Sequence, residues 1–247
     1  MLYTLAHIVR DRMPIVWSIV ERANSFLFFL RYGNRLRELR LTTVPQGYRL
    51  VPIREVPTEL LVDFFAKQPS EAFTYFRPHG FDSRSLKSLQ KNRSFLAYLL
   101  IDSAVGTASS VPTLASIAGY CFNRAFFHGK GFRGRMVDIG YRGKGLGTAM
   151  NIVLNEVGFG IGLQLYETVS KDNTASYRSA IRASETLVVK EDKDKRELLL
   201  EIVDAKSMPR KHRGLGIQCR TSRGGKSLTV AMRPLALSGC DRERRAA

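Results

Sequence analysis

Between residues 47 and 204, the hydrophobic and polar positions follow the periods of strands and helices in turn. A continuous apolar run typical of a buried strand occupies residues 95–101, and another strand is predicted over 163–169. A helix with one apolar face is predicted after residue 145. Its apolar residues recur with a 3.6-residue period at Leu146, Ala149, Met150, Val153, Leu154 and Val157. This alternation predicts an α/β fold.

The other segments complete the order strand, two helices, three strands, helix, strand, helix and two strands. One helix is predicted to begin at Thr58, after Pro57, and another after a cap at Asp82 or Ser83. The remaining predicted elements are strands at 47–53, 114–127 and 133–139, a short helix after Asn173, and a hairpin of 186–190 and 197–203.

Residues 1–46 are predicted to form a helical extension that is rich in apolar side chains. Its longest uncharged apolar runs, 13–20 and 23–30, are shorter than the ~20 residues needed to cross a bilayer. Two interpretations stay open. In the first, the helix packs on the main domain or on a second subunit. In the second, it lies on a membrane surface and directs basic side chains at lipid phosphates, namely Arg10, Arg12, Arg22 and Arg31.

The net charge of +17 is concentrated at the C-terminal end of the 247 residues. Residues 205–247 carry 11 Lys or Arg and 2 acidic residues, whereas residues 47–204 carry 21 and 17. We expect the basic tail, 205–247, to be largely disordered, with a short strand over 227–232. Such a tail binds RNA, acidic lipid or nothing specific.

Cysteine and histidine usage argues against a metal site and a disulfide framework. The three cysteines, Cys121, Cys219 and Cys240, have neither a zinc-ligand spacing nor a disulfide pattern, and the four histidines are scattered. The sequence therefore predicts a cytoplasmic protein without a metal cofactor, with peripheral membrane contact left open.

The clearest chemical signal is the segment 142–147, Arg-Gly-Lys-Gly-Leu-Gly, which lies between the predicted strand and the apolar helix. A glycine-rich turn at the start of a helix presents main-chain N–H groups where the helix dipole is positive, which suits phosphate oxygens. The segment fits neither the Walker pattern, which needs Ser or Thr after Gly-Lys, nor the dinucleotide pattern G-x-G-x-x-G.

The spacing R-x-x-G-x-G resembles the acetyl-CoA motif of the GNAT superfamily of N-acetyltransferases. The family often reads V-x-P-x-x-R-G-x-G-[IL]-G, and Ile139 replaces its usual proline here. The matching residues are Val137, Arg142, Gly143, Gly145, Leu146 and Gly147. The resemblance covers about residues 47–204 and implies a GNAT-like mixed central sheet flanked by helices, with an N-terminal helical extension and a basic tail.

The resemblance also implies acetyl-CoA as the acyl donor and a set of residues that hold it. In the family, the strand before the motif grips pantetheine and polarises the thioester, and the turn holds the pyrophosphate. The residues implied here are Met136, Val137, Asp138, Arg142, Gly143, Lys144, Gly145, Leu146, Gly147 and Thr148. Asn173 and Ser176 fit the family's N-x-x-[AS] pattern near the pantetheine arm, although Asn173 also suits a plain helix cap.

The expected catalytic residues are less clear than the coenzyme site. Many GNAT members use a Tyr seven residues after the Asn as the acid that protonates the thiolate, and Ala180 stands there in this chain. Tyr177 is the predicted acid and Glu167 the predicted base, with Asp138, Glu71 and His79 as the other candidates for the base. Glu71 and His79 lie in the segment 69–82, where the family builds its acceptor site.

These residues predict an N-acetyltransferase, an acyltransferase that moves groups other than aminoacyl groups. It would transfer acetyl directly from acetyl-CoA to a primary amine of an amino sugar, a small amine or a protein. The alternatives are a catalytically weak GNAT-fold adaptor that binds RNA or membrane through its tail, and transfer from a longer acyl donor. A second copy of the chain is a further expected partner.

Overall fold

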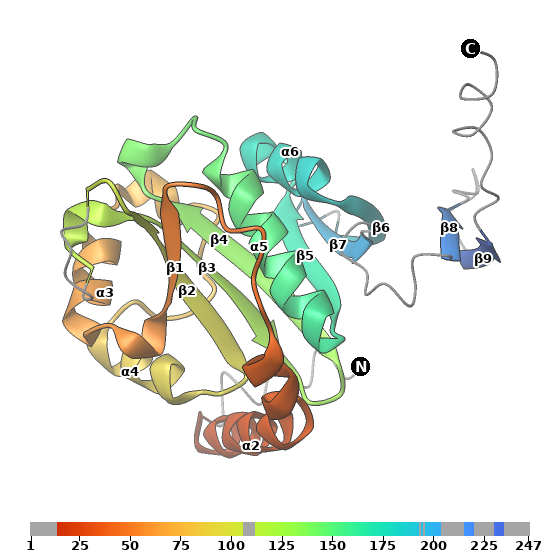
Figure 1. Cartoon of the computed structure of the whole chain (residues 1–247), viewed down its shortest axis with the longest axis horizontal. Coiled ribbons are helices and arrows are strands. Elements are labelled where there is room, and N and C mark those ends of the chain that lie inside the picture. The colour runs from red at the N-terminus through yellow and green to blue at the C-terminus, as the bar shows by residue number, and fades with distance from the viewer. Residues whose placement is uncertain are drawn as a thin grey trace, which may run out of the picture.

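The computed structural model describes residues 14–105, 112–192, 194, 196–203, 215–219 and 230–234. Seven strands form one sheet in the order β1-β2-β3-β4-β5-β7-β6. They are β1 (Tyr48–Pro52), β2 (Phe95–Asp102), β3 (Ile117–Ala125), β4 (Lys130–Val137), β5 (Gln164–Ser170), β6 (Glu185–Asp192) and β7 (Glu197–Val203). Neighbouring strands are antiparallel except β4 and β5, which are parallel (Figure 1).

Five α-helices surround this sheet within the described residues: α2 (Pro14–Glu38), α3 (Thr58–Ala66), α4 (Ser83–Lys91), α5 (Leu146–Ile161) and α6 (Thr174–Ala183). The predicted cap at Asp82 is confirmed, because its side chain accepts a hydrogen bond from the Ser85 amide. Helix α5 ends at Gly162, whose φ of +89° suits glycine and stops the helix.

The two faces of the sheet are separated by the alternation of side chains along each strand. On β3, Tyr120 and Phe122 belong to the core cluster beneath α3 and α4, whereas Cys121 belongs to the cluster beneath α5. The predicted apolar stripe of α5 forms much of the second cluster, and Met150 and Leu154 are fully buried. The predicted mixed sheet with helices on its faces is therefore confirmed.

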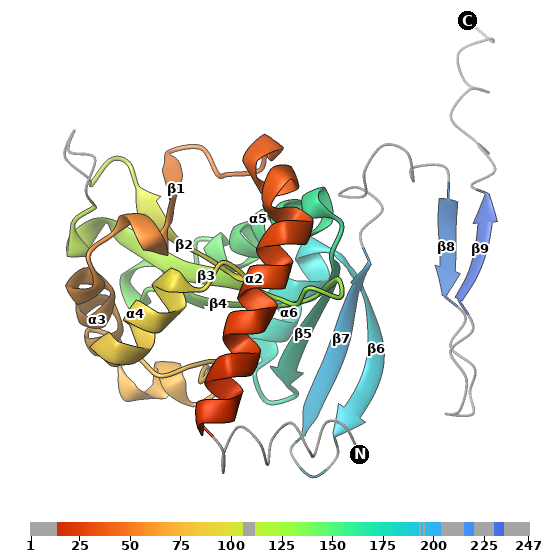
Figure 2. The same cartoon turned by 90° about the horizontal axis from the view of Figure 1, so that it is seen from below.

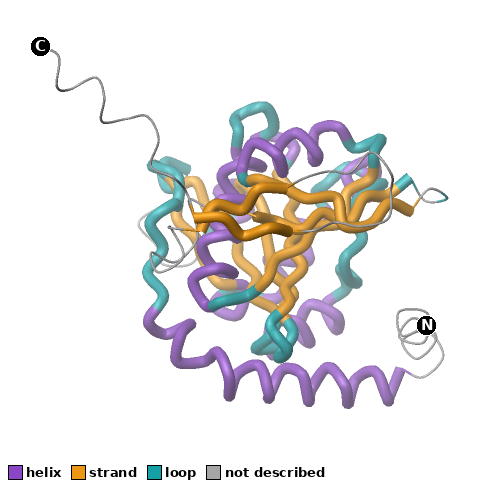
Figure 3. The backbone as a smooth tube through the Cα atoms, turned by 90° about the vertical axis from the view of Figure 1, so that its right-hand side faces the viewer, coloured by secondary structure: helices purple, strands orange, loops and turns teal. Residues whose placement is uncertain are grey.

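Helix α2 lies across one end of the sheet strands, at the periphery of the molecule (Figures 2 and 3). Phe28 and Tyr32 are buried in a core cluster shared with α5, β5 and β7. Arg35 also donates a hydrogen bond of 2.8 Å to the Ile161 carbonyl at the end of α5. Thus α2 packs on the body of the protein. None of the described helices has the length and apolarity needed to cross a bilayer.

Two predicted strand limits differ from the structure. The run 114–127 begins with a 3₁₀ turn at Leu114–Ser116, where Thr113 and Ser116 form a reciprocal capping box. The strand predicted over 133–139 instead spans Lys130–Val137, because β3 and β5 both pair with its first residues and a 3₁₀ turn begins at Ile139.

Part of the predicted basic tail is described as a separate two-stranded sheet. Strands β8 (Leu215–Cys219) and β9 (Val230–Pro234) pair in an antiparallel arrangement. β9 overlaps the short strand predicted over 227–232. The rest of 205–247 lies outside the described residues, as do residues 1–13, so the prediction of disorder there stays a prediction.

Candidate functional site

The glycine turn, residues 142–147, leaves β4 and opens helix α5. Gly143 and Gly145 have φ angles of +78° and +77°, in the left-handed region that favours glycine. Apart from the chain neighbours, no heavy atom of the described residues lies within 4 Å of the position that a Cβ would take at either residue. The turn therefore has the backbone shape that requires glycine, and open space stands in front of it.

The main-chain N–H groups of the glycine turn are available to a ligand. Among the described residues, none accepts a hydrogen bond from the amides of residues 143–147, and the first taken amide is that of Thr148, which donates to the Gly145 carbonyl at 3.0 Å. These unpartnered donors lie at the positive end of the 16-residue helix α5. The arrangement is able to bind the oxygens of a phosphate or pyrophosphate.

Asp138 lies between β4 and the glycine turn, and its side chain is buried. Its carboxylate accepts hydrogen bonds from Gln68 at 2.8 Å and the Gly140 amide at 2.9 Å, and it lies 3.0 Å from the Lys67 ammonium. Burial alone raises the pKa of Asp138, but these contacts from Gln68, Lys67 and Gly140 outweigh it and hold the pKa below its ordinary value. Asp138 therefore ties the turn to α3 in its charged form.

The parallel strands β4 and β5 separate next to the turn. They pair only from Lys130 with Gln164 to Phe132 with Tyr166. β4 continues for five further residues and β5 for four. Beyond Phe132, the two strands therefore leave main-chain groups without a ladder partner on the facing edges.

The direction of the β4 main chain shows which residues face this gap. The Gln164 amide donates to the Gly129 carbonyl, so odd-numbered residues face β5. The Asp138 amide donates to Ala118 on β3, at 3.0 Å, so even-numbered residues face the other way. Of the predicted residues Met136, Val137 and Asp138, only Val137 presents its main chain to the gap.

Two arginines and one glutamate form a buried charged cluster beneath the gap between β4 and β5. Glu167 on β5 accepts hydrogen bonds from Arg133 Nε at 2.7 Å and from Arg135 Nη1 at 2.6 Å. The arginine side chains are 0% and 6% exposed and the glutamate 4%. Burial alone raises the pKa of Glu167, but Arg135 and Arg133 outweigh it and hold the pKa below its ordinary value. Both carboxylate oxygens are thus engaged.

Helices α5 and α6 complete this polar network. Arg135 donates to the Ser176 carbonyl at 3.0 Å and to the hydroxyl of Ser179, while Arg133 donates to Asn155. Since two cations face one carboxylate, the network carries an excess positive charge. A Cβ at Gly147 would lie 3.7 Å from Arg135 Nε, so this charge sits directly under the glycine turn.

The exposed side of the turn is also positive. Arg142 and Lys144 are both exposed, and Lys144 Nζ lies 4.7 Å from the centroid of the Tyr141 ring. Within the part of the chain that the structure describes, neither side chain forms a salt bridge. The buried arginines, the helix dipole and these two side chains together favour an anion at one place.

Asn173 and Ser176 lie at the start of α6, beside this network. The Asn173 side chain accepts a hydrogen bond from the Ser176 amide at 3.1 Å, so it is the N-cap of α6. Tyr177 is half-buried and packs against the core cluster of α5, β5 and β7. Its hydroxyl forms no hydrogen bond with any residue that the structure describes.

His79 and Tyr120 form a second polar pair, on the opposite face of the sheet. His79 Nε2 lies 2.9 Å from the Tyr120 hydroxyl, and Nδ1 lies 2.9 Å from the Gly80 carbonyl. The carbonyl can only accept, so Nδ1 carries the proton and Nε2 accepts from Tyr120. Burial lowers the pKa of His79 from its ordinary 6.5 to about 4. Glu71, by contrast, is exposed.

The pKa of His79 predicts a specific acid sensitivity. Below about pH 6.5 the unfolded chain binds a proton that the folded chain takes up only near pH 4, so stability falls with the pH over this window. The shift corresponds to about 3 kcal/mol. His79→Phe keeps a ring among the aromatic neighbours but has no group that titrates. Between pH 6.5 and pH 4 we therefore expect the free energy of unfolding to fall by about 3 kcal/mol less in this variant than in the unmodified chain. Urea unfolding at several pH values measures this, and parallel pH profiles for the two proteins would contradict it.

Several residues of this site are absent from the predictions made from sequence. Arg133, Arg135, Asn155 and Ser179 contribute to the network, and only the alternation of Arg133 and Arg135 along a strand was a visible signal. Their partners come from segments 22 to 44 residues away. No group of three or more metal-ligating His, Cys, Asp or Glu side chains occurs in the described part of the chain.

Comparison with known proteins gives no match at the level of sequence. No protein-family model and no curated protein matches the chain. Solved structures do match. The GNAT domain of PAT from S. lividans aligns with a TM-score of 0.51 and 14% identity, over 63% of this chain and 89% of that one.

Two further solved structures are similar over a comparable part of the chain. The Campylobacter jejuni N-acetyltransferase PseH aligns with a TM-score of 0.45 and 17% identity, covering 63% of this chain and 97% of that one. The spermidine N-acetyltransferase of Vibrio cholerae, solved with CoA and spermine, gives a TM-score of 0.48 and 12% identity, covering 66% and 99%. The likeness to the PAT domain, together with the strand order, shows that this chain has the GNAT fold.

Proposed function

We propose that this chain, which has the GNAT fold, is an N-acetyltransferase that moves an acetyl group from acetyl-CoA directly to a primary amine. The observation that carries the proposal is the row of unpartnered amides over residues 143–147 beside the gap between β4 and β5. The acceptor is an amino sugar, a small amine or a protein amine. Fold alone does not decide function, so the proposal rests on this site.

The coenzyme would be bound by main-chain groups and by positive charge. In the proposal, the amides of the glycine turn hold the pyrophosphate, with the exposed side chains of Arg142 and Lys144 beside it. The pantetheine arm lies along the open edge of β4, where the main chain of Val137 faces the gap. Asn173 and Ser176 border the arm from α6. The main-chain groups of the turn and of β4 are already held in place by the fold, which lowers the entropy cost of binding.

The chemistry needs little from the side chains once the thioester is in place. The amine nitrogen, in its neutral form, attacks the thioester carbon, the new C–N bond forms, and the C–S bond breaks to release CoA thiolate. The proton that the nitrogen loses passes to solvent water. A main-chain N–H of β4 stabilises the negative charge that develops on the carbonyl oxygen. Cys121 is not a nucleophile, because burial raises the pKa of its thiol to about 12.

Glu167 enters this proposal as a positioning residue. A base needs a carboxylate oxygen that is accessible to the amine, and both oxygens of Glu167 accept hydrogen bonds from buried arginines. The glutamate instead holds Arg133 and Arg135 on β4 against β5, at the point where the two strands separate.

Tyr177 is the proposed acid that protonates the leaving thiolate. We expect Tyr177→Phe to lower kcat about 100-fold, a typical value for loss of a general acid, with the Kd of acetyl-CoA unchanged. Steady-state kinetics and calorimetric titration measure the two constants separately. An unchanged kcat would remove Tyr177 from the mechanism and leave the thiolate to depart without an acid.

A thiol-release screen tests the proposed activity itself. Acetyl-CoA is mixed with the full chain and with sets of amino sugars, polyamines, small amines and peptides, and free CoA thiol is measured. Amine-dependent release supports the enzyme and identifies its acceptor class. The absence of acetyl-CoA binding at millimolar coenzyme, measured by calorimetry, would overturn the proposal.

A further inference from the structure

Helix α2 carries an apolar stripe on the side that faces solvent. Its members recur at helical spacing over four turns and most are strongly exposed. They are Val16 (38%), Ile19 (60%), Val20 (50%), Ala23, Phe26 (59%), Leu27 (41%) and Leu30 (65%). We call this set the outer stripe. Isolated exposed apolar residues are ordinary, but a continuous stripe on one helix indicates a surface that is covered by a partner.

The opposite side of α2 is firmly attached to the protein. Phe28 and Tyr32 are buried at 0% and 2% exposure. Asn24 donates to the Ser94 hydroxyl at 2.9 Å and to the Ala125 carbonyl at 3.1 Å, and its own oxygen accepts from the Phe127 amide. The helix therefore cannot rotate its outer stripe toward the protein without breaking the contacts of Phe28, Tyr32 and Asn24.

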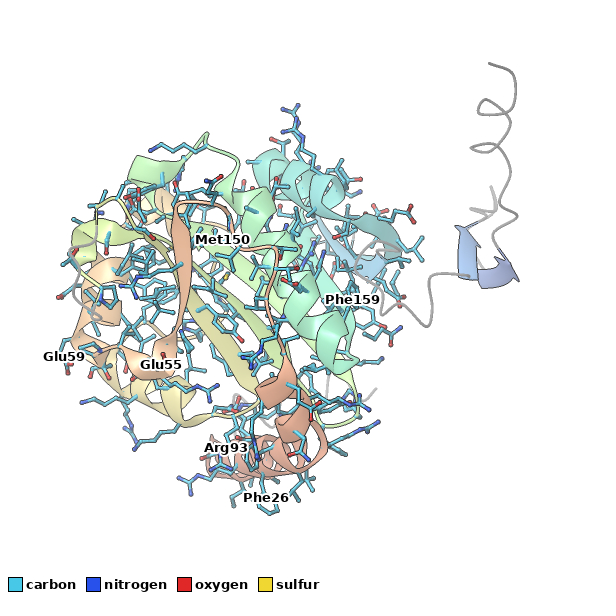
Figure 4. All side chains as sticks on the ribbon, viewed as in Figure 1. Phe26, Glu55, Glu59, Arg93, Met150 and Phe159 are labelled. Atoms are coloured by element: carbon cyan, nitrogen blue, oxygen red, sulfur yellow. The ribbon has the colours of Figure 1, made fainter. Side chains whose placement is uncertain are left out.

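Positive charge borders the outer stripe along both of its edges. Arg22 lies one turn from Ile19 and Phe26, and Arg31 lies one turn from Leu27 on the other edge. One nitrogen of Arg31 donates to the Phe127 carbonyl at 3.0 Å, and the side chain stays exposed. Arg93 extends this border from the body of the protein, beside α2 (Figure 4). Its guanidinium carbon lies 4.1 Å from the centroid of the Phe29 ring. Long arginine stems lie along apolar surface while their guanidinium groups reach anionic head groups.

Acidic side chains are rare at the same surface. Helix α2 contains two, and Glu21 is already paired with Arg124 at 2.8 Å. The other acidic residue of α2, Glu38, is in the last turn of the helix, two turns after the stripe ends at Leu30. A second copy of α2 would bring arginines against arginines without glutamates to pair them, whereas an anionic lipid surface supplies the missing negative charge.

We propose that α2 docks the protein on an anionic lipid surface, with the outer stripe in the interfacial layer and Arg22, Arg31 and Arg93 at lipid phosphates. The inference is independent of the proposed acetyltransferase activity. It places the helix parallel to the membrane plane, as an interfacial helix that does not cross the bilayer.

Flotation of the full chain with vesicles tests this proposal. We expect the protein to float with phosphatidylcholine vesicles that contain phosphatidylglycerol and not with phosphatidylcholine alone. The double variant Ile19→Gln/Leu30→Gln should bind at least about tenfold more weakly, since it removes two exposed side chains that would enter the lipid.

A matched control keeps the basic tail and the net charge unchanged. Ile181→Gln/Val189→Gln removes two exposed apolar side chains, 45% and 48% exposed, outside α2, and should bind like the unmodified chain. Equal binding by the unmodified chain and the Ile19/Leu30 variant would overturn the proposal in favour of the tail. A dimer in solution that the same variant converts to a monomer, without vesicle binding, would overturn it in favour of a second copy.

Discussion

Replacing Gly145 by glutamate is expected to weaken acetyl-CoA binding by at least about 100-fold, or about 2.7 kcal/mol. The residue is the N-cap of α5, and open space stands where its side chain would begin. A carboxylate there would occupy the place of the pyrophosphate and repel it. Two like charges 4 Å apart near a protein surface cost about 4 kcal/mol at an effective dielectric constant of 20. Calorimetric titration with acetyl-CoA measures the loss.

Gly47 offers a matched control for this substitution. It has a φ of +81°, no heavy atom of the described residues beyond its chain neighbours lies within 4 Å of its Cβ position, and it precedes β1, outside the glycine turn. Gly47→Glu imposes the same left-handed strain, about 1–2 kcal/mol, and adds the same charge. We expect the two variants to unfold at similar temperatures, while only Gly145→Glu loses acetyl-CoA. Equal affinity in both variants would contradict a pyrophosphate site at this turn.

The elements that the sequence predicts best are those with a strong period or a local signal. The apolar stripe of α5, the buried run of β2 and the cap at Asp82 each depend on residues within one or two turns of one another. The glycine turn is predicted for the same reason, because left-handed φ angles at Gly143 and Gly145 are a property of the local chain.

The polar face of α5 was not predicted, and its cause lies outside the helix. Asn151 and Asn155 are fully buried, although a polar residue beside an apolar stripe is usually solvated. Helix α6 covers them: Asn155 donates to Ser184, and Asn151 lies 3.4 Å from the Ser179 hydroxyl. Only the tertiary arrangement brings these residues together, so no periodicity along the chain could reveal them.

The chemical role of Glu167 also could not be predicted from local sequence. Its place on a strand that follows the glycine motif suggests a base near the acceptor, but a sequence does not tell which charges will face a carboxylate. Arg133 and Arg135 are separated from Glu167 by 34 and 32 residues and meet it only because β4 and β5 are neighbours in the sheet. The partners decide the role of the residue, and here they engage both of its oxygens.

Replacing Glu167 by glutamine is expected to lower the free energy of unfolding by about 3 kcal/mol or more. The variant keeps the shape of the side chain but leaves Arg133 and Arg135 as buried cations with no carboxylate between them. Breaking a buried ion pair from one side typically costs 3–5 kcal/mol. Urea unfolding at neutral pH measures the effect. The control Glu191→Gln breaks the exposed pair with Lys171, about 40% exposed on each side, and should cost about 0.5 kcal/mol or less.

The dependence on pH provides a second test of the same network. A carboxyl group whose folded pKa is lowered adds stability above its ordinary pKa of 4.5, and this contribution is lost as the pH falls through the folded pKa. The unmodified chain should therefore lose stability more steeply below about pH 5 than Glu167→Gln does. Adding Arg135→Gln to the glutamine variant should recover part of the loss, since one buried cation is then removed. Equal acid sensitivity in the unmodified chain and Glu167→Gln, with no recovery in the double variant, would show that the buried charges do not hold β4 and β5 in their arrangement.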